Sequence, residues 1–330
     1  MTTSAIAVTG LRKTFGDKTV LDGIDLEVPA GTVFSLLGPN GAGKTTTVNV
    51  LTTLTKADGG TVRVAGHDVV SEPKAVRSAI GVTGQFAAVD ELLTGRENLQ
   101  LMVDLSPARS KSTRIDDKQI VNNLLERFDL VEAADKSTAT YSGGMRRKLD
   151  LAMTLIGDPR IIFLDEPTTG LDPRSRRTMW TIVRELVADG VTIFLTTQYL
   201  DEADELADRI AVLNNGRLVA QGTPDELKRQ IPGTHVRFRF GSADELDAAA
   251  AIMPGATRDD DALTLRVPSD AGTKSVRALL DRLDDAGLDA DEFSVHTPDL
   301  DDVFLALTGH DTQTGGDSLT GNDNAEVAAK

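Results

Sequence analysis

The feature that most constrains this chain is the segment G-P-N-G-A-G-K-T at residues 38–45. It has the form G-x-x-x-x-G-K-T, in which glycines let the backbone curl so that its N–H groups surround phosphate oxygens. Lys44 is expected to reach the β- and γ-phosphates of a nucleotide, and Thr45 to offer its hydroxyl to Mg²⁺. The residues expected to bind the nucleotide here are Gly38, Pro39, Asn40, Gly41, Ala42, Gly43, Lys44, Thr45 and Thr46.

The neighbourhood of this segment fits a phosphate-binding loop. Residues 33–37 (V-F-S-L-L) predict a buried strand, and residues 46–55 predict a helix. A strand followed by the loop and a helix is the context that the motif requires, and the helix brings the positive end of its dipole to the phosphates. We therefore favour a nucleotide site over a glycine-rich turn without a ligand.

Composition narrows the class of protein. The chain has 330 residues, enough for one large domain or two smaller ones. It contains no cysteine, which excludes disulfides and thiolate metal sites, and its net charge of −16 argues against a nucleic-acid partner. The apolar runs are strand-sized and the N-terminus has no signal-peptide pattern, so we expect a cytosolic protein.

The negative charge is concentrated in the last part of the chain. Residues 231–330 contain 20 acidic and 8 basic residues, which accounts for −12 of the total. With Pro232 and Gly233 nearby, this shift predicts a boundary that separates a domain at 1–230 from an accessory domain at 231–310. The accessory part alternates strand and helix patterns, so we expect a small α+β fold with a solvated acidic surface. Residues 311–330 have almost no large apolar side chain and are predicted to be a disordered tail.

Residues 5–28 alternate apolar and polar side chains around turn signals, which predicts an antiparallel β region. Phe15 lies in this region, and two interpretations of it stay open. Its ring can stack on an adenine base, or it can simply fill the core, which composition alone favours.

Two further segments carry polar groups at the ends of predicted elements. A strand over 80–85 ends at Gln85, and ligand groups sit at the carboxyl ends of strands in open α/β sheets. After a mostly helical stretch at 91–157, Ser142 precedes a helical run and can cap it, while Gly143 and Gly144 expose backbone N–H groups. This arrangement predicts a second anion site, distant in sequence from the first.

A third apolar strand, at 160–166, ends in two carboxylates. Asp165 is placed to hold Mg²⁺ directly or through water, and Glu166 to accept a proton from an attacking water. Buried carboxylates are costly without a cation partner, so their position favours a functional site over a surface pair. The next strand, at 191–197, is followed directly by Gln198.

Taken in this order, residues 5 to about 230 resemble the ATP-binding subunit of an ABC transporter. The resemblance implies an α/β, phosphate-loop (RecA-like) core with an antiparallel β subdomain and a helical subdomain at about 86–157. It also implies a role in catalysis and Mg²⁺ binding for Gln85 and a nucleotide contact for Asp172 of the G-L-D segment at 170–172. In this resemblance, Phe15 lies at the position that stacks on the base, and Gln198 lies where the family has a catalytic histidine. The family's signature segment corresponds to Ser142, Gly143 and Gly144.

Three segments narrow the resemblance to the daunorubicin-resistance type of drug-exporter ATPase: residues 83–85, 196–204 and 299–309. The chain departs from the wider family pattern at four positions. Phe15 replaces tyrosine, Tyr141 replaces leucine, Met145 replaces glutamine and Gln198 replaces histidine. The last departure concerns hydrolysis rather than nucleotide binding.

The function implied by the resemblance is ATP hydrolysis, with Mg²⁺, that drives multidrug or antibiotic export. The partners implied are a separate membrane permease, which mainly handles the cargo, and a second copy of the chain with ATP at the interface. The resemblance also implies that the chain is attached to the cytoplasmic face of the membrane through the permease. A soluble, ribosome-associated ABC ATPase is one alternative, although such proteins usually carry two cassettes and this chain has one phosphate loop. A kinase is the other, and the Ser-Gly-Gly segment and Glu166 argue against it.

Overall fold

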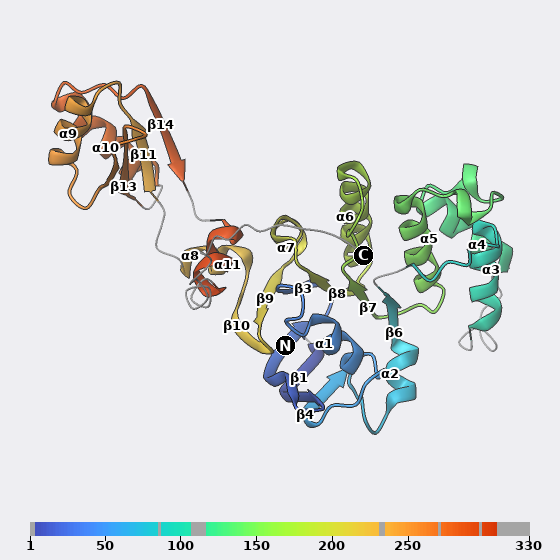
Figure 1. The fold of residues 1–330 in the computed structure, drawn as a ribbon. Helices are drawn as coiled ribbons and strands as arrows, with labels where there is room; N and C mark the ends of the chain where they lie inside the picture. The colour runs from blue at the N-terminus through green and yellow to red at the C-terminus, as the bar shows by residue number, and fades with distance from the viewer. Residues whose placement is uncertain are drawn as a thin grey trace, which may run out of the picture.

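The computed structural model describes residues 4–84, 87–106, 117–230, 235–269, 272–296 and 299–308 (Figure 1). Two of the sequence predictions fall outside these ranges. They are the role of Gln85 and the disordered tail at 311–330.

The chain begins with the expected antiparallel β region. Strands β1 (Ser4–Phe15) and β2 (Lys18–Pro29) form a hairpin. Strands β4 (Gly59–Val64) and β5 (His67–Asp68) complete a sheet in the order β2-β1-β4-β5. One side of each long strand is buried because apolar and polar residues alternate, and this apolar side packs with Val48 of the first helix and Phe34 of the central sheet.

A six-stranded sheet forms the centre of the molecule, in the order β10-β9-β3-β8-β7-β6. Its strands are β3 (Val33–Leu37), β6 (Ile80–Thr83), β7 (Ile161–Asp165), β8 (Thr192–Thr197), β9 (Arg209–Asn214) and β10 (Arg217–Gly222). All neighbours are parallel except β9 and β10, which form an antiparallel hairpin. Its turn residues Asn215 and Gly216 have φ of 46° and 75°, as a two-residue type I′ turn requires.

The parallel arrangement positions the site. Strands β3, β7 and β8 are buried along their whole length, and Phe34, Phe163 and Phe194 pack together at ring-centroid distances of 5.5 and 5.4 Å. Their carboxyl ends meet at one edge of the sheet, and the phosphate loop, Glu166 and Gln198 each follow one of these strands.

Helix α1 (Lys44–Leu51) differs from the expected 46–55 at both ends. It starts earlier because Gly43 adopts a left-handed conformation (φ 112°) that lets the loop turn directly into the helix. It ends earlier because Thr53 has φ 68° and the Thr52 hydroxyl donates back to the Val48 carbonyl (2.8 Å), which are both features of a helix end. Helix α2 (Pro73–Ala79) follows β5.

A helical region lies beyond β6 (Figure 1). It contains α3 (Gly95–Leu105), α4 (Asp117–Arg127) and α5 (Gly143–Leu155), with short 3₁₀ turns at Val131–Ala133 and Thr138–Thr140. These helices share one core with α6 (Pro173–Ala188), built around Leu99, Phe128, Leu149 and Val183. A capping box between Thr94 and Glu97 begins α3.

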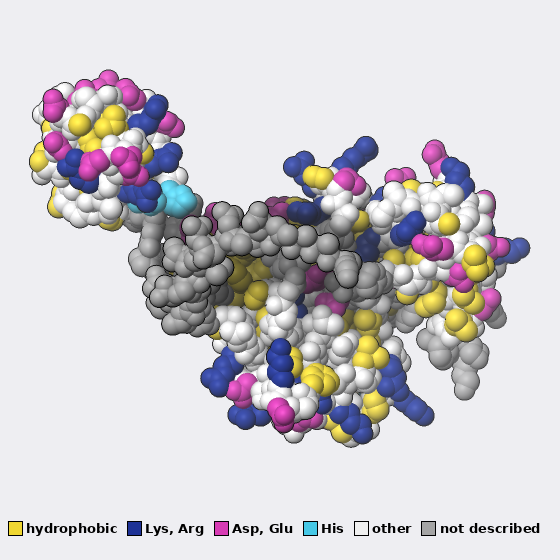
Figure 2. All heavy atoms as spheres, viewed as in Figure 1, with side chains coloured by type: hydrophobic (Ala, Val, Ile, Leu, Met, Phe, Trp, Pro, Cys, Tyr) yellow, Lys and Arg dark blue, Asp and Glu magenta, His cyan; other side chains and the backbone are white. Residues whose placement is uncertain are grey.

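The C-terminal part has its own sheet and core, and its α+β fold is as expected. The sheet order is β12-β13-β11-β14, formed by β11 (His235–Arg239), β12 (Thr257–Asp259), β13 (Thr264–Pro268) and β14 (Glu292–His296). Helices α9 (Ala243–Ile252) and α10 (Thr273–Asp285) cover it through a core that includes Phe238, Leu246 and Leu279. Strand β12 was missed because it is only three residues long. Figure 2 shows acidic side chains mixed with basic ones over this lobe rather than gathered in one patch.

The last helix, α11 (Leu300–Thr308), packs elsewhere. Its Leu300 and Val303 are buried against Leu37, Ala203 and Leu227, that is, against β3, α7 (Leu200–Leu206) and α8 (Pro224–Gln230). Figure 1 shows α11 beside α8 and apart from the β11–β14 sheet. The chain therefore leaves the part that contains the six-stranded sheet after α8 and returns to it with α11. Among the helices in the described ranges, none combines the length and apolar character needed to cross a membrane.

Candidate active site

The phosphate loop connects β3 to α1 and depends on its glycines. Gly41 and Gly43 have φ of 80° and 112°, which side chains disfavour. A Cβ atom at Gly38 would lie 2.3 Å from the Leu213 carbonyl oxygen, and one at Gly43 would lie 2.7 Å from Leu21 Cδ2. The loop is thus packed tightly between β2 and β9, where only glycine fits.

Lys44 is buried at the base of this loop, with 5 % of its side chain exposed. Its ammonium donates to the carbonyl oxygens of Gly38 (2.8 Å) and Pro39 (3.2 Å) and lies 3.2 Å from Glu166 Oε1. The fold thus joins the loop lysine to the carboxylate after β7, and Lys44 is the cation partner that the sequence argument required. In this structure the Glu166 carboxylate balances the charge of the Lys44 ammonium.

The two carboxylates after β7 are held by β8. Asp165 is buried and accepts a hydrogen bond from the Thr196 hydroxyl through Oδ1. The Glu166 N–H donates to the Thr196 carbonyl (3.1 Å), and the residue has φ 48°. A left-handed conformation costs a non-glycine residue about 1–2 kcal/mol, so the surrounding contacts must hold Glu166 in place. Such a strained residue at the end of a central strand is a common mark of a functional site.

The donors at this site suit Mg²⁺. The Thr45 side chain is exposed in the first turn of α1, and no described residue donates a hydrogen bond to Asp165 Oδ2. A hydroxyl and a carboxylate are the hard oxygen ligands that Mg²⁺ takes in small number, because it keeps water and substrate phosphates as its other ligands.

Gln198 follows β8 and is half-buried, and its side-chain amide makes no hydrogen bond within the described ranges. The preceding Thr197 accepts a hydrogen bond from the Tyr199 N–H through Oγ1 (2.9 Å), which sets the turn after the strand. The Gln198 amide is thus available to a ligand at the edge of the sheet where Glu166 lies.

Phe15 does not fill the core. It ends β1 and is 52 % exposed, with Lys13 Nζ 5.0 Å from the ring centroid. The prediction that Phe15 fills the core was wrong. Composition cannot show that the last residues of β1 extend beyond the part of the strand that is buried. Phe15 pairs with Lys18 at the start of β2, the strand whose Val20 and Leu21 pack against Gly43 of the phosphate loop.

The Ser142-Gly143-Gly144 segment opens α5 as the sequence predicts. Ser142 Oγ accepts from the Met145 N–H at 3.2 Å, and a Cβ atom at Gly144 would lie 2.6 Å from Ser175 Oγ. The departure at Tyr141 has a structural reason. Tyr141 is buried, donates to the Ala133 carbonyl (2.7 Å) and leaves no room for a side chain at Gly95.

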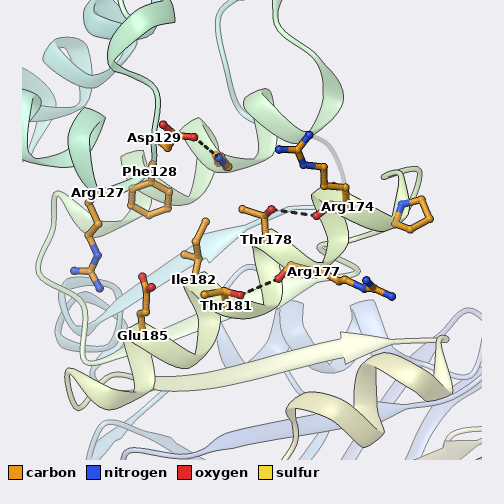
Figure 3. A pocket seen from close by; sticks show the side chains of 11 residues that line it. Arg127, Phe128, Asp129, Arg174, Arg177, Thr178, Thr181, Ile182 and Glu185 are labelled. Carbon is orange, nitrogen blue, oxygen red and sulfur yellow. Dashed lines mark hydrogen bonds and ion pairs between the residues drawn. The ribbon is translucent and has the colours of Figure 1, made fainter.

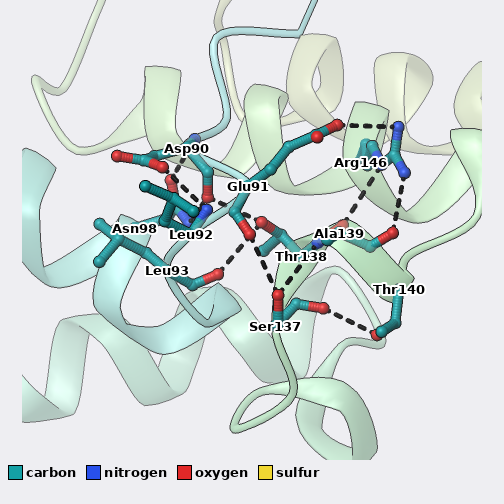
Figure 4. A network of polar contacts seen from close by, with 10 residues as sticks. All are labelled: Asp90, Glu91, Leu92, Leu93, Asn98, Ser137, Thr138, Ala139, Thr140 and Arg146. Carbon is teal, nitrogen blue, oxygen red and sulfur yellow. Dashed lines mark hydrogen bonds and ion pairs between the residues drawn. The ribbon is translucent and has the colours of Figure 1, made fainter.

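The polar network in Figure 4 anchors the segment before Ser142 to the loop before α3. Thr138 Oγ1 donates to the Asp90 carbonyl (2.8 Å), Ser137 Oγ to the Glu91 carbonyl (3.0 Å), and Arg146 pairs with Glu91 (3.2 Å). Sequence reasoning missed this network because Thr138 and Ser137 donate to backbone carbonyls, which leave no signature in the residue pattern, and because Arg146 and Glu91 are far apart in the sequence.

Asp172 caps α6. Its carboxylate accepts from the N–H groups of Arg174 and Ser175 (both 3.0 Å) and from Ser175 Oγ (2.6 Å), and these bonds hold the pKa of Asp172 below its usual range. Ser142, Gly144 and Asp172 line one hollow where α5 and α6 meet. Their common position could not be read from the sequence.

The site residues thus form two groups in one chain. The first contains the phosphate loop with Glu166, and the second contains Ser142, Gly144 and Asp172. No polar contact among the described residues joins Ser142, Gly143 or Gly144 to the loop at 38–45, and Figure 1 shows β6 and β7 between α1 and α5. Ser142 and Gly143 are exposed at the N-terminus of α5 and Gly144 is buried, and a further hollow is lined by both Gly143 and Glu166.

A separate hollow beside the second group is not the nucleotide site. It is lined mainly by α6 and by residues around the end of α4, including Arg127, Arg174 and Arg177 (Figure 3). The hydrogen bonds drawn there run within α6, from Thr178 and Thr181 to carbonyls one turn earlier. None of the phosphate-loop residues lines it.

Comparison with known proteins agrees with this geometry. The family model described as ABC transporter matches residues 21–169, and that described as ATP-binding protein DrrA1-3-like, C-terminal domain, matches residues 222–308. The chain is 50 % identical to the daunorubicin resistance ATP-binding protein DrrA3 of Streptomyces coeruleorubidus, over 94 % of this chain and 98 % of that protein. It is 42 % identical to the doxorubicin resistance ATP-binding protein DrrA of Mycobacterium tuberculosis, over 94 % and 95 %. It is 39 % identical to the Nod factor export ATP-binding protein I of Rhizobium sp., over 95 % and 100 %.

Solved structures show the same fold for the ATP-binding part. An ATP-binding subunit of an ABC transporter superimposes with a TM-score of 0.61 at 27 % identity, over 68 % of this chain and 92 % of that one. An ATP-binding cassette of an ABC transporter in its ADP conformation gives 0.61 at 28 % identity, over 68 % and 93 %. The resemblance and the fold class predicted from the sequence are confirmed, and the kinase alternative is excluded. The chain therefore belongs to the ATP-binding ATPase subunits of ABC transporters, in the group that carries a DrrA-like C-terminal domain.

Proposed function

We propose that this chain hydrolyses ATP to drive the export of drug-like, antibiotic compounds through a separate membrane permease. The observation that carries the proposal is the full-length match, which includes the C-terminal domain, to ATP-binding proteins named for daunorubicin and doxorubicin resistance. None of the relatives reported above is a ribosome-associated protein, so that alternative gains no support.

In the proposed reaction, the loop N–H groups hold the ATP phosphates and Lys44 moves its hydrogen bonds from the Gly38 and Pro39 carbonyls to phosphate oxygens. This movement separates Lys44 from Glu166 and frees the carboxylate to accept a proton from water. Thr45 and Asp165 would hold Mg²⁺, which offsets charge on the β- and γ-phosphates when bound. Gln85 stays a proposed partner of the same centre.

We propose that a second copy of the chain completes the site. Ser142, Gly143 and Gly144 lie at the N-terminus of α5, and among the described residues no hydrogen bond or ion pair joins them to their own phosphate loop. In a two-fold, head-to-tail pair, these N–H groups would face the γ-phosphate in the partner's loop, with Asp172 beside them. ATP would then be buried between the copies, and each hydrolysis event would allow them to separate.

The same proposal places the chain at the cytoplasmic face of the membrane, attached through the permease, which would make most contacts with the cargo. The test is to co-purify the chain with a candidate membrane permease and to reconstitute both in liposomes. We expect ATP-dependent movement of an anthracycline across the bilayer. ATP hydrolysis that ignores both permease and drug, with co-purification of ribosomes, would favour the regulatory alternative instead.

Replacing Phe15 by alanine is expected to raise the KM for ATP about tenfold, since stacking on a base contributes about 1–3 kcal/mol. The melting temperature should hardly change because the ring is 52 % exposed. Phe15→Tyr is the matched control and should keep the parent KM. Equal KM values for all three proteins would show that Phe15 does not contact the base.

Replacing Gln198 by alanine is expected to lower ATP turnover roughly tenfold or more, the scale of losing one hydrogen bond to a phosphate in the transition state. Glutamine can donate an N–H to a phosphate oxygen, although it does not titrate as histidine does. Gln198→His should therefore preserve activity. The measurement is steady-state hydrolysis at saturating Mg-ATP with the permease present, and an alanine variant as fast as the parent would exclude Gln198 as a phosphate sensor.

A further inference from the structure

Arg147 is a buried arginine on α5 whose side chain, 8 % exposed, makes three hydrogen bonds to carbonyl oxygens. Nη1 donates to Gly84 (2.6 Å), Nη2 to Asp165 (3.2 Å) and Nε to Pro167 (3.0 Å). Two of these acceptors lie on either side of Glu166 in the sequence. One side chain of the helix that Ser142 caps is thus hydrogen-bonded to the backbone on both sides of the candidate catalytic base, Glu166.

These hydrogen bonds can stabilise Glu166, which has an unfavourable backbone conformation. Its φ of 48° lies in the left-handed region, which glutamate rarely adopts. The Asp165 carbonyl belongs to the peptide that enters Glu166, and the Pro167 carbonyl belongs to the peptide that follows the next residue. With the Glu166 N–H bonded to the Thr196 carbonyl (3.1 Å), Arg147 completes a set of contacts that holds the backbone on both sides of Glu166.

The guanidinium is itself held from its own helix. Arg147 Nη1 lies 3.4 Å from Asp150 Oδ2, and Asp150 Oδ1 accepts from the Ala88 N–H at 2.9 Å. Burial lowers the pKa of Arg147 and raises the pKa of Asp150, while the attraction between the two groups opposes both shifts. The pair therefore stays ordered and ties α5 to Gly84 and Ala88 at the end of β6.

We propose that Arg147 is a positioning residue for Glu166, which links the catalytic carboxylate to the place of α5 and its signature segment. The inference rests on the proposed role of Glu166 as the base. A shift of α5 when a second copy binds would be transmitted through the guanidinium to the peptides around Glu166. Only arginine offers a planar fork with donors for three carbonyls, whereas the lysine ammonium is a single point of charge.

The first test compares Arg147→Lys and Arg147→Met with the parent. We expect kcat for ATP hydrolysis to fall tenfold or more in both variants. The KM for ATP should change less than threefold, because none of the contacts of Arg147 with other described residues reaches the phosphate loop. Arg184→Lys is the control. Arg184 also joins two helices through a backbone carbonyl, that of Glu205 (3.0 Å), but lies half-exposed on α6. It should keep kcat within twofold.

The second test separates positioning from general stability. Arg147→Lys is combined with Glu166→Gln, and single-turnover hydrolysis is measured in all four proteins. If Arg147 acts through Glu166, its replacement should slow the Glu166→Gln protein less than twofold further. Losses that multiply, an unchanged kcat in Arg147→Lys, or unfolding of both Arg147 variants would each overturn the inference. A Glu166→Gln protein with normal turnover would instead overturn the proposed function.

Discussion

Replacing Lys44 by alanine is expected to remove nearly all ATP binding and hydrolysis. The Lys44 ammonium is the buried cation at the base of the phosphate loop, held by the Gly38 and Pro39 carbonyls and by Glu166. Its loss removes the only charge that the loop itself can direct at the β- and γ-phosphates. Removing one partner of a buried charge pair costs ~2–5 kcal/mol, so affinity should fall by about 100-fold or more.

The measurement is calorimetric titration with Mg-ATP, together with the rise in melting temperature that ATP produces in the parent. Lys56 provides the control because it is exposed at the end of the same loop–helix unit, and Lys56→Ala should bind as the parent does. Without ligand, the Lys44→Ala variant should also unfold at a somewhat lower temperature than the parent, because Glu166 loses the cation with which it is paired. Turnover equal to that of the parent would contradict the assignment of the loop.

Glu166→Gln is expected to bind ATP but to hydrolyse it at least 100-fold more slowly. The amide preserves the shape of the side chain, yet it cannot accept a proton from water, and a general base contributes about 10²–10⁴-fold. The change also removes the ion pair that holds Lys44 away from the phosphates. ATP affinity should therefore equal or exceed that of the parent.

Because hydrolysis would be stalled, this variant should accumulate as an ATP-bound pair. Light scattering with Mg-ATP measures the mass directly, and Glu185→Gln on the exposed side of α6 is the matched control, which should hydrolyse normally. A monomer with slow turnover would leave Glu166 as the base and exclude the paired site. A monomer with normal turnover would exclude both.

Much of the fold was predictable because its signals are local. Residues 33–37 are apolar except for Ser35, and residues 161–164 are all apolar, as expected for parallel strands that are buried on both faces; both segments are strands. Ser142 caps α5 as predicted, because a cap needs only a hydroxyl at the right position before the helix. Helix ends were less accurate, as α1 shows, because single backbone dihedrals at Gly43 and Thr53 decide them.

The contents of the candidate site were predictable for the same reason, although its geometry was not. Residue type and position at the ends of strands were enough to predict the loop glycines, Lys44, Asp165 and Glu166 as site residues. Three features of the site depend on elements that are far apart in the sequence. They are the contact between Lys44 and Glu166, the exposure of Phe15, and the hydrogen bonds from Arg147 to the backbone around Glu166. The acceptors of the Arg147 hydrogen bonds are backbone carbonyls. Because every residue has a backbone carbonyl, the sequence does not indicate which ones an arginine will contact.

The sequence by itself determined the order of the elements, the phosphate loop and the family, because these follow from residue types at short spacing. Only the tertiary structure decided which surfaces meet. The apolar side of α11 was visible in the sequence, yet Leu300 and Val303 are buried against Leu37 and Leu227 of the ATP-binding part rather than in the neighbouring α+β core. An amphipathic helix shows that it must bury one face, but apolar burial is not directional, so the choice of partner depends on the whole fold.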